Sequence, residues 1–144
     1  MNINEIQDRI IEEYSGYDDW FDMYEAIIAE GDKLTPFDMK NKTDDNSISG
    51  CQSKIWLLTE MNGKNMKITG DSDAKITRGI LALLLRTLDG QPPKDIAGSD
   101  LYFIEKIGLG SNLSPARSDG LNAIIREIKD RAGKYYPLLE CGNI

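Results

Sequence analysis

The sequence predicts an α+β fold, in which a small antiparallel sheet of about three strands is covered by helices. Apolar residues repeat at helical spacing near both ends of the chain. Between them the period changes to that of β-strands, and an Asn-Gly pair joins two strand-like runs, as is typical of a hairpin. The length of 144 residues fits one hydrophobic core, so we expect a single domain over residues 1–144.

Two helices are expected before residue 32, with Gly16 between them. The first has Asn2 or Asn4 as its candidate N-cap, and the second covers about 18–30 and ends at Gly31. The apolar face of the first helix is formed by Ile3, Ile6, Ile10, Ile11 and Tyr14, and that of the second by Trp20, Tyr24, Ile27 and Ile28. Residues 32–47 are polar and irregular, which predicts a loop.

The strand-like runs cover residues 54–60 and 64–70. The first is almost continuously apolar, which suggests that both of its faces are covered, whereas the second alternates between apolar and polar residues. Asn62-Gly63 is the expected two-residue turn, because both residue types tolerate positive φ. Ile48 and its neighbours are expected to add a short third strand.

Helices are expected to fill the rest of the chain. Asp71, Ser72 and Asp73 are good caps for a helix at about 74–88, and close packing against the sheet would explain Gly79 inside it. Short helical pieces are expected around 93–97 and 101–107. Ser114 followed by a proline predicts the start of a last helix that ends near Arg131, and residues 135–144 show no clear pattern.

The charge and hydropathy of the chain exclude several classes of function. Its net charge of −7 argues against a general role with nucleic acids, because such proteins present a basic face to phosphates. The longest apolar run, residues 80–85, is too short to cross a bilayer. The N-terminus lacks the basic segment and apolar run of a signal peptide. We therefore expect a cytoplasmic protein that does not act at a membrane.

The residue types that are scarce or missing narrow the chemistry further. The chain has no histidine, which excludes Ser-His and Cys-His pairs and histidine-containing metal sites. It has two cysteines, Cys51 and Cys141, so a four-thiolate zinc or iron–sulfur site cannot form within one chain. We expect no metal site and, in a reducing compartment, no structural disulfide. Any sulfur chemistry therefore rests on one thiol.

Cys51 is the candidate reactive thiol. It stands in Ser49-Gly50-Cys51-Gln52-Ser53, at the end of an irregular segment, and loops of this kind often carry function. A thiol with the ordinary pKa of about 8.5 is mostly protonated at neutral pH, so a cation such as Lys54 or Arg117 is needed nearby. The alternative is that Cys51 is an inert buried residue, since free cysteine is among the most buried residue types.

Three blocks of the sequence resemble those of the SufE family. Gly50-Cys51-Gln52-Ser53-Lys54-Ile55-Trp56 is similar to the signature around the family's acceptor cysteine. Gly70-Asp71-Ser72-Asp73-Ala74 with Arg78-Gly79, and Leu113-Ser114-Pro115-Ala116-Arg117-Ser118-Asp119-Gly120-Leu121, resemble the second and third blocks. The blocks have the family's order and spacing, and only Lys54 and Ala116 depart from its usual residues. The resemblance covers about 18–131 and leaves 132–144, with Cys141, as a tail to which we assign no role.

The resemblance implies a fold shared with the IscU-type iron–sulfur scaffold proteins. It implies that the chain accepts persulfide sulfur from a SufS-type cysteine desulfurase, stimulates that enzyme, and passes the sulfur to the SufBCD scaffold for iron–sulfur cluster assembly. The pyridoxal phosphate belongs to the desulfurase, so the chain needs no cofactor and is an accessory protein without an independent turnover. The matching acceptor is Cys51, and the supporting residues are Gly50, Gln52, Ser53, Asp71, Asp73 and Arg117.

The roles of the supporting residues stay open at this point. Asp71 and Asp73 are either helix caps or acid–base groups. Arg117 either stabilises a thiolate or forms a structural ion pair with one of these aspartates. Because a persulfide is vulnerable to reductants and oxidants, we also expect Cys51 to be sheltered between partners, in a cavity lined by residues such as Trp56 or Leu57.

Three other functions are alternatives. A scaffold that builds the cluster itself needs several thiolate ligands, more than the blocks contain. A thiol redox protein would use Cys51 and Cys141 as an exchanging pair, although the chain has no Cys-x-x-Cys motif. A regulatory module would bind and activate a desulfurase without accepting sulfur.

Overall fold

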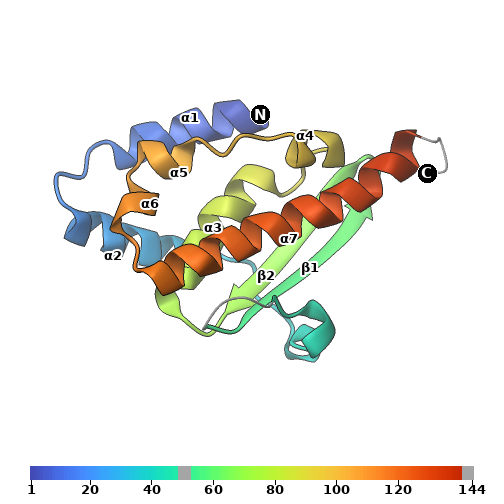
Figure 1. Ribbon diagram of the computed structural model, residues 1–144, viewed down its shortest axis with the longest axis horizontal. Coiled ribbons are helices and arrows are strands. Elements are labelled where there is room, and N and C mark those ends of the chain that lie inside the picture. Colours follow the sequence, from blue (N-terminus) through green and yellow to red (C-terminus); the bar gives the residue numbers. More distant parts are fainter. Residues whose placement is uncertain (49–52, 141–144) are drawn as a thin grey trace.

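A computed structural model describes residues 1–48 and 53–140 of the chain, and for 137–140 it describes the backbone only. These residues form helices and a two-stranded antiparallel sheet (Figure 1), so the predicted α+β class is confirmed. The helices are α1 (Ile3–Tyr14), α2 (Trp20–Gly31), α3 (Lys75–Leu88), α4 (Pro93–Ala97), α5 (Phe103–Lys106), α6 (Leu109–Asn112) and α7 (Pro115–Glu140). The strands are β1 (Ile55–Asn62) and β2 (Asn65–Ser72), preceded by the 3₁₀ turns η1 (Met39–Asn41) and η2 (Asp44–Asn46).

The first two helices begin at side-chain caps. Asn2 caps α1 and forms a reciprocal capping box with Glu5. Asp19 caps α2 by accepting a hydrogen bond from the amide of Asp22. α2 then packs along α3, and a Cβ on Gly79 would lie only 2.0 Å from the backbone oxygen of Ile27. The close approach that Gly79 permits is therefore to helix α2, and not to the sheet as predicted.

The predicted antiparallel hairpin is present, but its turn lies one residue further along, which changes the residues that pair. Asn62 pairs with Asn65, so the two central residues are Gly63 and Lys64. Gly63 has a φ of +66°, whereas Lys64 has a negative φ. This pattern fits a type II′ turn, which needs glycine only at its first central position.

The sheet buries one face. Along β1, the buried side chains of Ile55 and Leu57 alternate with the half-buried ones of Trp56 and Leu58. The expectation that both faces of this strand are covered holds only in part, because helices bury one face while the loop with η1 and η2 leaves Trp56 and Leu58 half-exposed on the other. The buried face meets α3 and α7 in a core that includes Ile55, Leu57, Met66, Ile68, Ile80, Leu84, Ile124 and Ile128.

The expected third strand is reduced to a single bridge. Ser47 pairs with Trp56, and the amide of Ile48 donates a 2.9 Å hydrogen bond to the carbonyl oxygen of Ile55. The residues that would lengthen this strand toward the N-terminus are instead wound into η1 and η2. In the described ranges the sheet therefore has two strands, one fewer than predicted.

The last helix is longer than predicted. The amide of Arg117 bonds to the Ser114 hydroxyl at its start, as expected, but α7 continues beyond Arg131 to Glu140. Arg131 donates to the carbonyl oxygen of Leu57, and the hydroxyl of Tyr135 donates to that of Thr59. These contacts hold the end of α7 against the outer edge of β1, a tertiary effect that hydrophobic periodicity does not report. Across the described ranges, no helix is both long and apolar enough to cross a membrane.

Candidate functional site

The predicted acceptor falls in a stretch that the structure does not describe. Gly50, Cys51 and Gln52 lie in residues 49–52, and Cys141 lies in residues 141–144, so both stretches are outside the described residues. We call residues 49–52 the acceptor stretch. The site is therefore built from the residues on either side of it and from the elements that hold them. Of the predicted supporting residues, the structure describes Ser53, Asp71, Asp73 and Arg117.

The chain is fixed to the sheet on both sides of this stretch. On the N-terminal side, Ile48 is hydrogen-bonded to Ile55 at the start of β1. On the C-terminal side, the carbonyl oxygen of Lys54 accepts bonds from the Ser72 hydroxyl at 2.8 Å and from the Asp73 amide at 3.2 Å. The carboxylate of Asp73 in turn accepts from the amide of Lys54 at 3.0 Å. These bonds place both ends of the acceptor stretch at one end of the hairpin.

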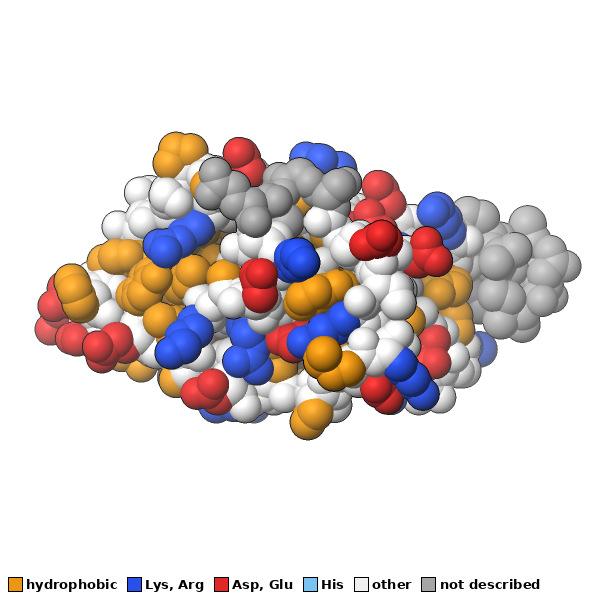
Figure 2. All heavy atoms as spheres, turned by 90° about the horizontal axis from the view of Figure 1, so that it is seen from below, with side chains coloured by type: hydrophobic (Ala, Val, Ile, Leu, Met, Phe, Trp, Pro, Cys, Tyr) orange, Lys and Arg blue, Asp and Glu red, His pale blue; other side chains and the backbone are white. Residues whose placement is uncertain are grey.

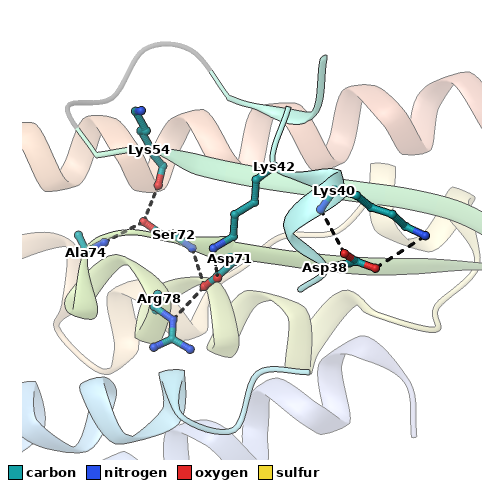
Figure 3. A network of polar contacts seen from close by, with 8 residues as sticks. All are labelled: Asp38, Lys40, Lys42, Lys54, Asp71, Ser72, Ala74 and Arg78. Carbon is teal, nitrogen blue, oxygen red and sulfur yellow. Dashed lines mark hydrogen bonds and ion pairs between the residues drawn. The ribbon is translucent and has the colours of Figure 1, made fainter. Parts of the chain in front are cut away.

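Asp71 lies beside this anchor and binds two cations (Figure 3). One carboxylate oxygen accepts from Nε of Arg78 at 2.9 Å and from the Ser72 amide at 2.8 Å. The other lies 3.1 Å from Nζ of Lys42. Partial burial pushes the pKa of Asp71 up, but the amide of Ser72 and the charges of Lys42 and Arg78 outweigh it, so the pKa lies below its ordinary value. Asp71 therefore stays ionised and joins β2, α3 and the loop before β1.

The aspartates are not the helix caps that the sequence predicts. The N-cap residue of α3 is Ala74, and it makes no side-chain capping bond. The carboxylate of Asp71 is occupied by Lys42 and Arg78, and that of Asp73 by the amide of Lys54. Both side chains therefore hold the chain next to residues 49–52 and do not cap α3, because their oxygens bind Lys42, Arg78 and the amide of Lys54.

A cavity of about 430 Å³ opens beside Ser53, the first described residue after the acceptor stretch. Three elements enclose it: the start of β1, the first turn of α3 and the start of α7. Its lining residues are Ser53, Ile55, Ala74, Ile76, Thr77, Ser114, Ala116, Arg117 and Gly120. Trp56 and Leu57, the residues expected to line a sheltering cavity, are not among them, because Leu57 is fully buried in the core and Trp56 lies on the outer face of the sheet.

Arg117 is the cation at this cavity. Its guanidinium carbon lies 5.6 Å from the ring centroid of Tyr24 on α2, which is a cation–π contact. In the part of the chain that the structure describes, Arg117 forms no ion pair with Asp71 or Asp73. The structural ion pair that was one of the two roles considered for Arg117 is instead made by Arg78. The charge of Arg117 is therefore not neutralised by a described carboxylate.

Lys42 and Arg78 are the site residues that sequence reasoning missed. Lys42 stands in a polar loop with no pattern, and its ammonium also lies 4.8 Å from the ring centroid of Trp56. Arg78 belongs to the second sequence block, which is a signal that was available. Within residues 1–48 and 53–136, no three acidic side chains gather as a metal site would need.

Comparisons with known proteins identify the family of the chain. A family model described as SufE, "Fe-S metabolism associated domain", matches residues 8–132. An uncharacterized SufE-like protein of Rhizobium etli is 39% identical over 130 residues, which cover 87% of this chain and 88% of that protein. A similar protein of Rhizobium meliloti is 35% identical over 135 residues, covering 90% and 96%.

The fold also has a counterpart among solved structures. The solution structure of a hypothetical protein from Thermus thermophilus aligns with a TM-score of 0.74, covering 90% of this chain and 94% of that one. The two sequences are 16% identical, so the likeness is one of fold.

Proposed function

Because the chain belongs to the SufE family, which is associated with iron–sulfur metabolism, we propose that it carries sulfur as a persulfide on Cys51. The donor is a SufS-type cysteine desulfurase, whose turnover the protein stimulates, and the receiver is the SufBCD scaffold. The observation that best supports this is the double anchoring of the chain around residue 51. Ile48 is held by Ile55, and Lys54 by Ser72 and Asp73, next to a cavity lined by Arg117.

The proposed step is a transfer between two thiols. The thiolate of Cys51 attacks the outer sulfur of the persulfide on the donor's cysteine, forming a new S–S bond on Cys51. The S–S bond in the donor breaks at the same time, and the donor's cysteine leaves as a thiolate. No net oxidation or reduction occurs, and no metal or cofactor is needed on this chain. The pyridoxal phosphate that releases sulfur from cysteine belongs to the desulfurase.

The surroundings of the stretch suit this step. The attacking group must be ionised part of the time, and a cation within a few ångströms favours the thiolate. Arg117 lines the cavity and pairs with no carboxylate among the described residues, whereas Lys42 and Arg78 are both bonded to Asp71. We therefore assign Arg117 the electrostatic role, and Asp71 and Asp73 the role of holding the chain.

Mass spectrometry tests the proposal directly. The protein is incubated with the desulfurase and cysteine, and the cysteine-containing peptides are then analysed. We expect a gain of one or more sulfur atoms on the peptide with Cys51, none in Cys51→Ser, and an unchanged gain in the matched control Cys141→Ser. Sulfur uptake by Cys51→Ser would refute the carrier role.

The same variants separate the alternatives. If the protein is a regulatory module, it accepts no sulfur, and its Cys51→Ser variant should still stimulate the desulfurase. A redox pair would lose activity with Cys141→Ser as well, because an exchanging pair needs both thiols.

A further inference from the structure

The start of α2 exposes aromatic side chains. Phe21 is 78% exposed and Tyr17 40%, the highest values for described aromatic residues. Trp20 and Tyr24 are half-buried beside them, with their ring centroids 6.1 Å apart in an edge-to-face arrangement. We call these four residues the α2 aromatic surface. Figure 2 shows hydrophobic side chains gathered at this end of the molecule, where α2, α6 and the start of α7 lie.

Acidic residues follow three of these aromatic residues in the sequence. Asp18, Asp22 and Glu25 are exposed, and none of them is ion-paired to a described lysine or arginine. The helix dipole explains an acidic residue in the first turn, such as Asp22. It does not explain Glu25 in the second turn, nor the exposure of Phe21 next to Asp22. An exposed aromatic side chain with a polar rim is the composition of a protein interface, in which aromatic residues supply much of the binding energy.

The α2 aromatic surface is continuous with the candidate site. Arg117 contacts the ring of Tyr24 on one side and lines the cavity with Ser53 on the other. A protein that reaches the cavity beside Ser53 therefore meets Arg117 and, through it, the α2 aromatic surface. Aromatic and arginine side chains are also the types most enriched at the energetic centre of interfaces.

We propose that the α2 aromatic surface docks the sulfur-donating protein through a basic surface with an apolar socket for Phe21. Asp18, Asp22 and Glu25 outnumber the one described cation at this surface, Arg117, so it favours a basic partner, since like charges across an interface weaken binding and opposite charges speed the encounter. This inference rests on the proposed function for its choice of partner. It does not depend on which thiol receives the sulfur, so the two can fail separately.

The test compares Phe21→Ser with Met39→Ser in stimulation of a SufS-type cysteine desulfurase. Met39 on η1 is 74% exposed, close to the value for Phe21, but lies on a different element. We expect Phe21→Ser to raise the concentration for half-maximal stimulation about tenfold, as for a central interface residue, with turnover at saturation unchanged. Met39→Ser should match the unchanged protein, and thermal melts confirm that both variants fold.

A charge reversal tests these acidic residues. Asp22→Lys should weaken binding of the same desulfurase, and Asp95→Lys, on α4 and well away from α2 in Figure 1, should not. Binding of the unchanged protein should also weaken as salt is raised, because exposed charges are screened. If Asp22→Lys binds as tightly as the unchanged protein, the basic partner surface is wrong.

Three outcomes would overturn the proposal. The first is equal half-maximal concentrations for Phe21→Ser and Met39→Ser. The second is the absence of any binding between the unchanged protein and the desulfurase. The third is a change from dimer to monomer in Phe21→Ser by sedimentation, with desulfurase binding intact, which would assign the surface to a second copy. Measuring the binding of Cys51→Ser to the desulfurase separates the docking surface from the carrier role. If this variant binds normally but takes up no sulfur, the result concerns Cys51 alone.

Discussion

Nζ of Lys42 lies 3.1 Å from the carboxylate of Asp71 and 4.8 Å from the ring centroid of Trp56. One ammonium group therefore joins the loop before β1 to both strands of the hairpin, since Trp56 and Asp71 are cross-strand neighbours. Lys42 precedes the acceptor stretch in the sequence, whereas Lys54, to which Ser72 and Asp73 bind, follows it. Asp71, Ser72 and Asp73, at the end of β2, therefore hold the chain before and after the acceptor stretch.

Replacing Lys42 should destabilise the fold measurably. Lys42→Met keeps most of the side-chain volume but removes the half-buried ion pair and the cation–π contact, so we expect a loss of about 1 kcal/mol. Lys40→Met is the matched control, because the Lys40–Asp38 pair has side chains that are 78% and 56% exposed. That control should change the free energy of unfolding by less than about 0.5 kcal/mol. Urea denaturation measures both, and equal losses would contradict the assigned role.

The contribution of Asp71 should depend on pH. Its pKa in the folded protein lies below the ordinary carboxyl value of 3.8, so its ionised form stabilises the fold at neutral pH. This stabilisation is present above the unfolded pKa and is lost as pH falls through the folded pKa. The difference in free energy of unfolding between the unchanged protein and Asp71→Asn should thus be constant from pH 7 to about 5 and shrink below about 4. A difference that grows toward low pH would reverse the sign.

Two glycines should respond to alanine in opposite directions. At Gly79 a Cβ would lie 2.0 Å from the backbone oxygen of Ile27, so Gly79→Ala must push α2 and α3 apart. We expect it to cost about 1–3 kcal/mol, although alanine is intrinsically better than glycine in a helix by about 1 kcal/mol. A Cβ on Gly133 in α7 would meet no atom within 4 Å, so Gly133→Ala should stabilise the protein slightly. Chemical denaturation of both variants decides, and a neutral Gly79→Ala would show that the helices can separate freely.

The elements that follow from local rules were predictable, and the contacts between distant residues were not. The capping residue Asn2 and the hairpin follow from spacing and turn chemistry within a few residues. The extra turns of α7 depend on Arg131 and Tyr135 reaching the edge of β1, more than 70 residues away in sequence. Likewise, Asp73 resembles a helix cap until Lys54 is brought to it by the fold.

The candidate site shows the same division. The blocks around Cys51, Asp71 and Arg117 could be found in the sequence because each is a local pattern. Lys42 could not, because its partners Asp71 and Trp56 are joined to it only when the loop folds over the sheet. The cavity beside Ser53 is enclosed by three separate elements, so no single pattern predicts its lining.

Removing the charge of Arg117 should make the proposed thiol less reactive. The measurement is the pH dependence of Cys51 alkylation by iodoacetamide, in a Cys141→Ser background so that one thiol is labelled. If Arg117 favours the thiolate, Arg117→Gln raises the pKa obtained from this profile and slows alkylation at neutral pH. Arg117→Lys keeps the charge and should retain most of the rate.

The matched control for this prediction lies on the same helix. Arg126 is exposed on α7 and does not line the cavity, so Arg126→Gln removes the same charge at a place outside the site. Its alkylation profile should overlay that of the unchanged protein. A shift of equal size in both variants would mean that only the overall charge of the protein matters. Removing a cation that stabilises a thiolate must raise the pKa of the thiol. An unshifted profile in Arg117→Gln would therefore refute the electrostatic role and leave Arg117 only its structural contact with Tyr24.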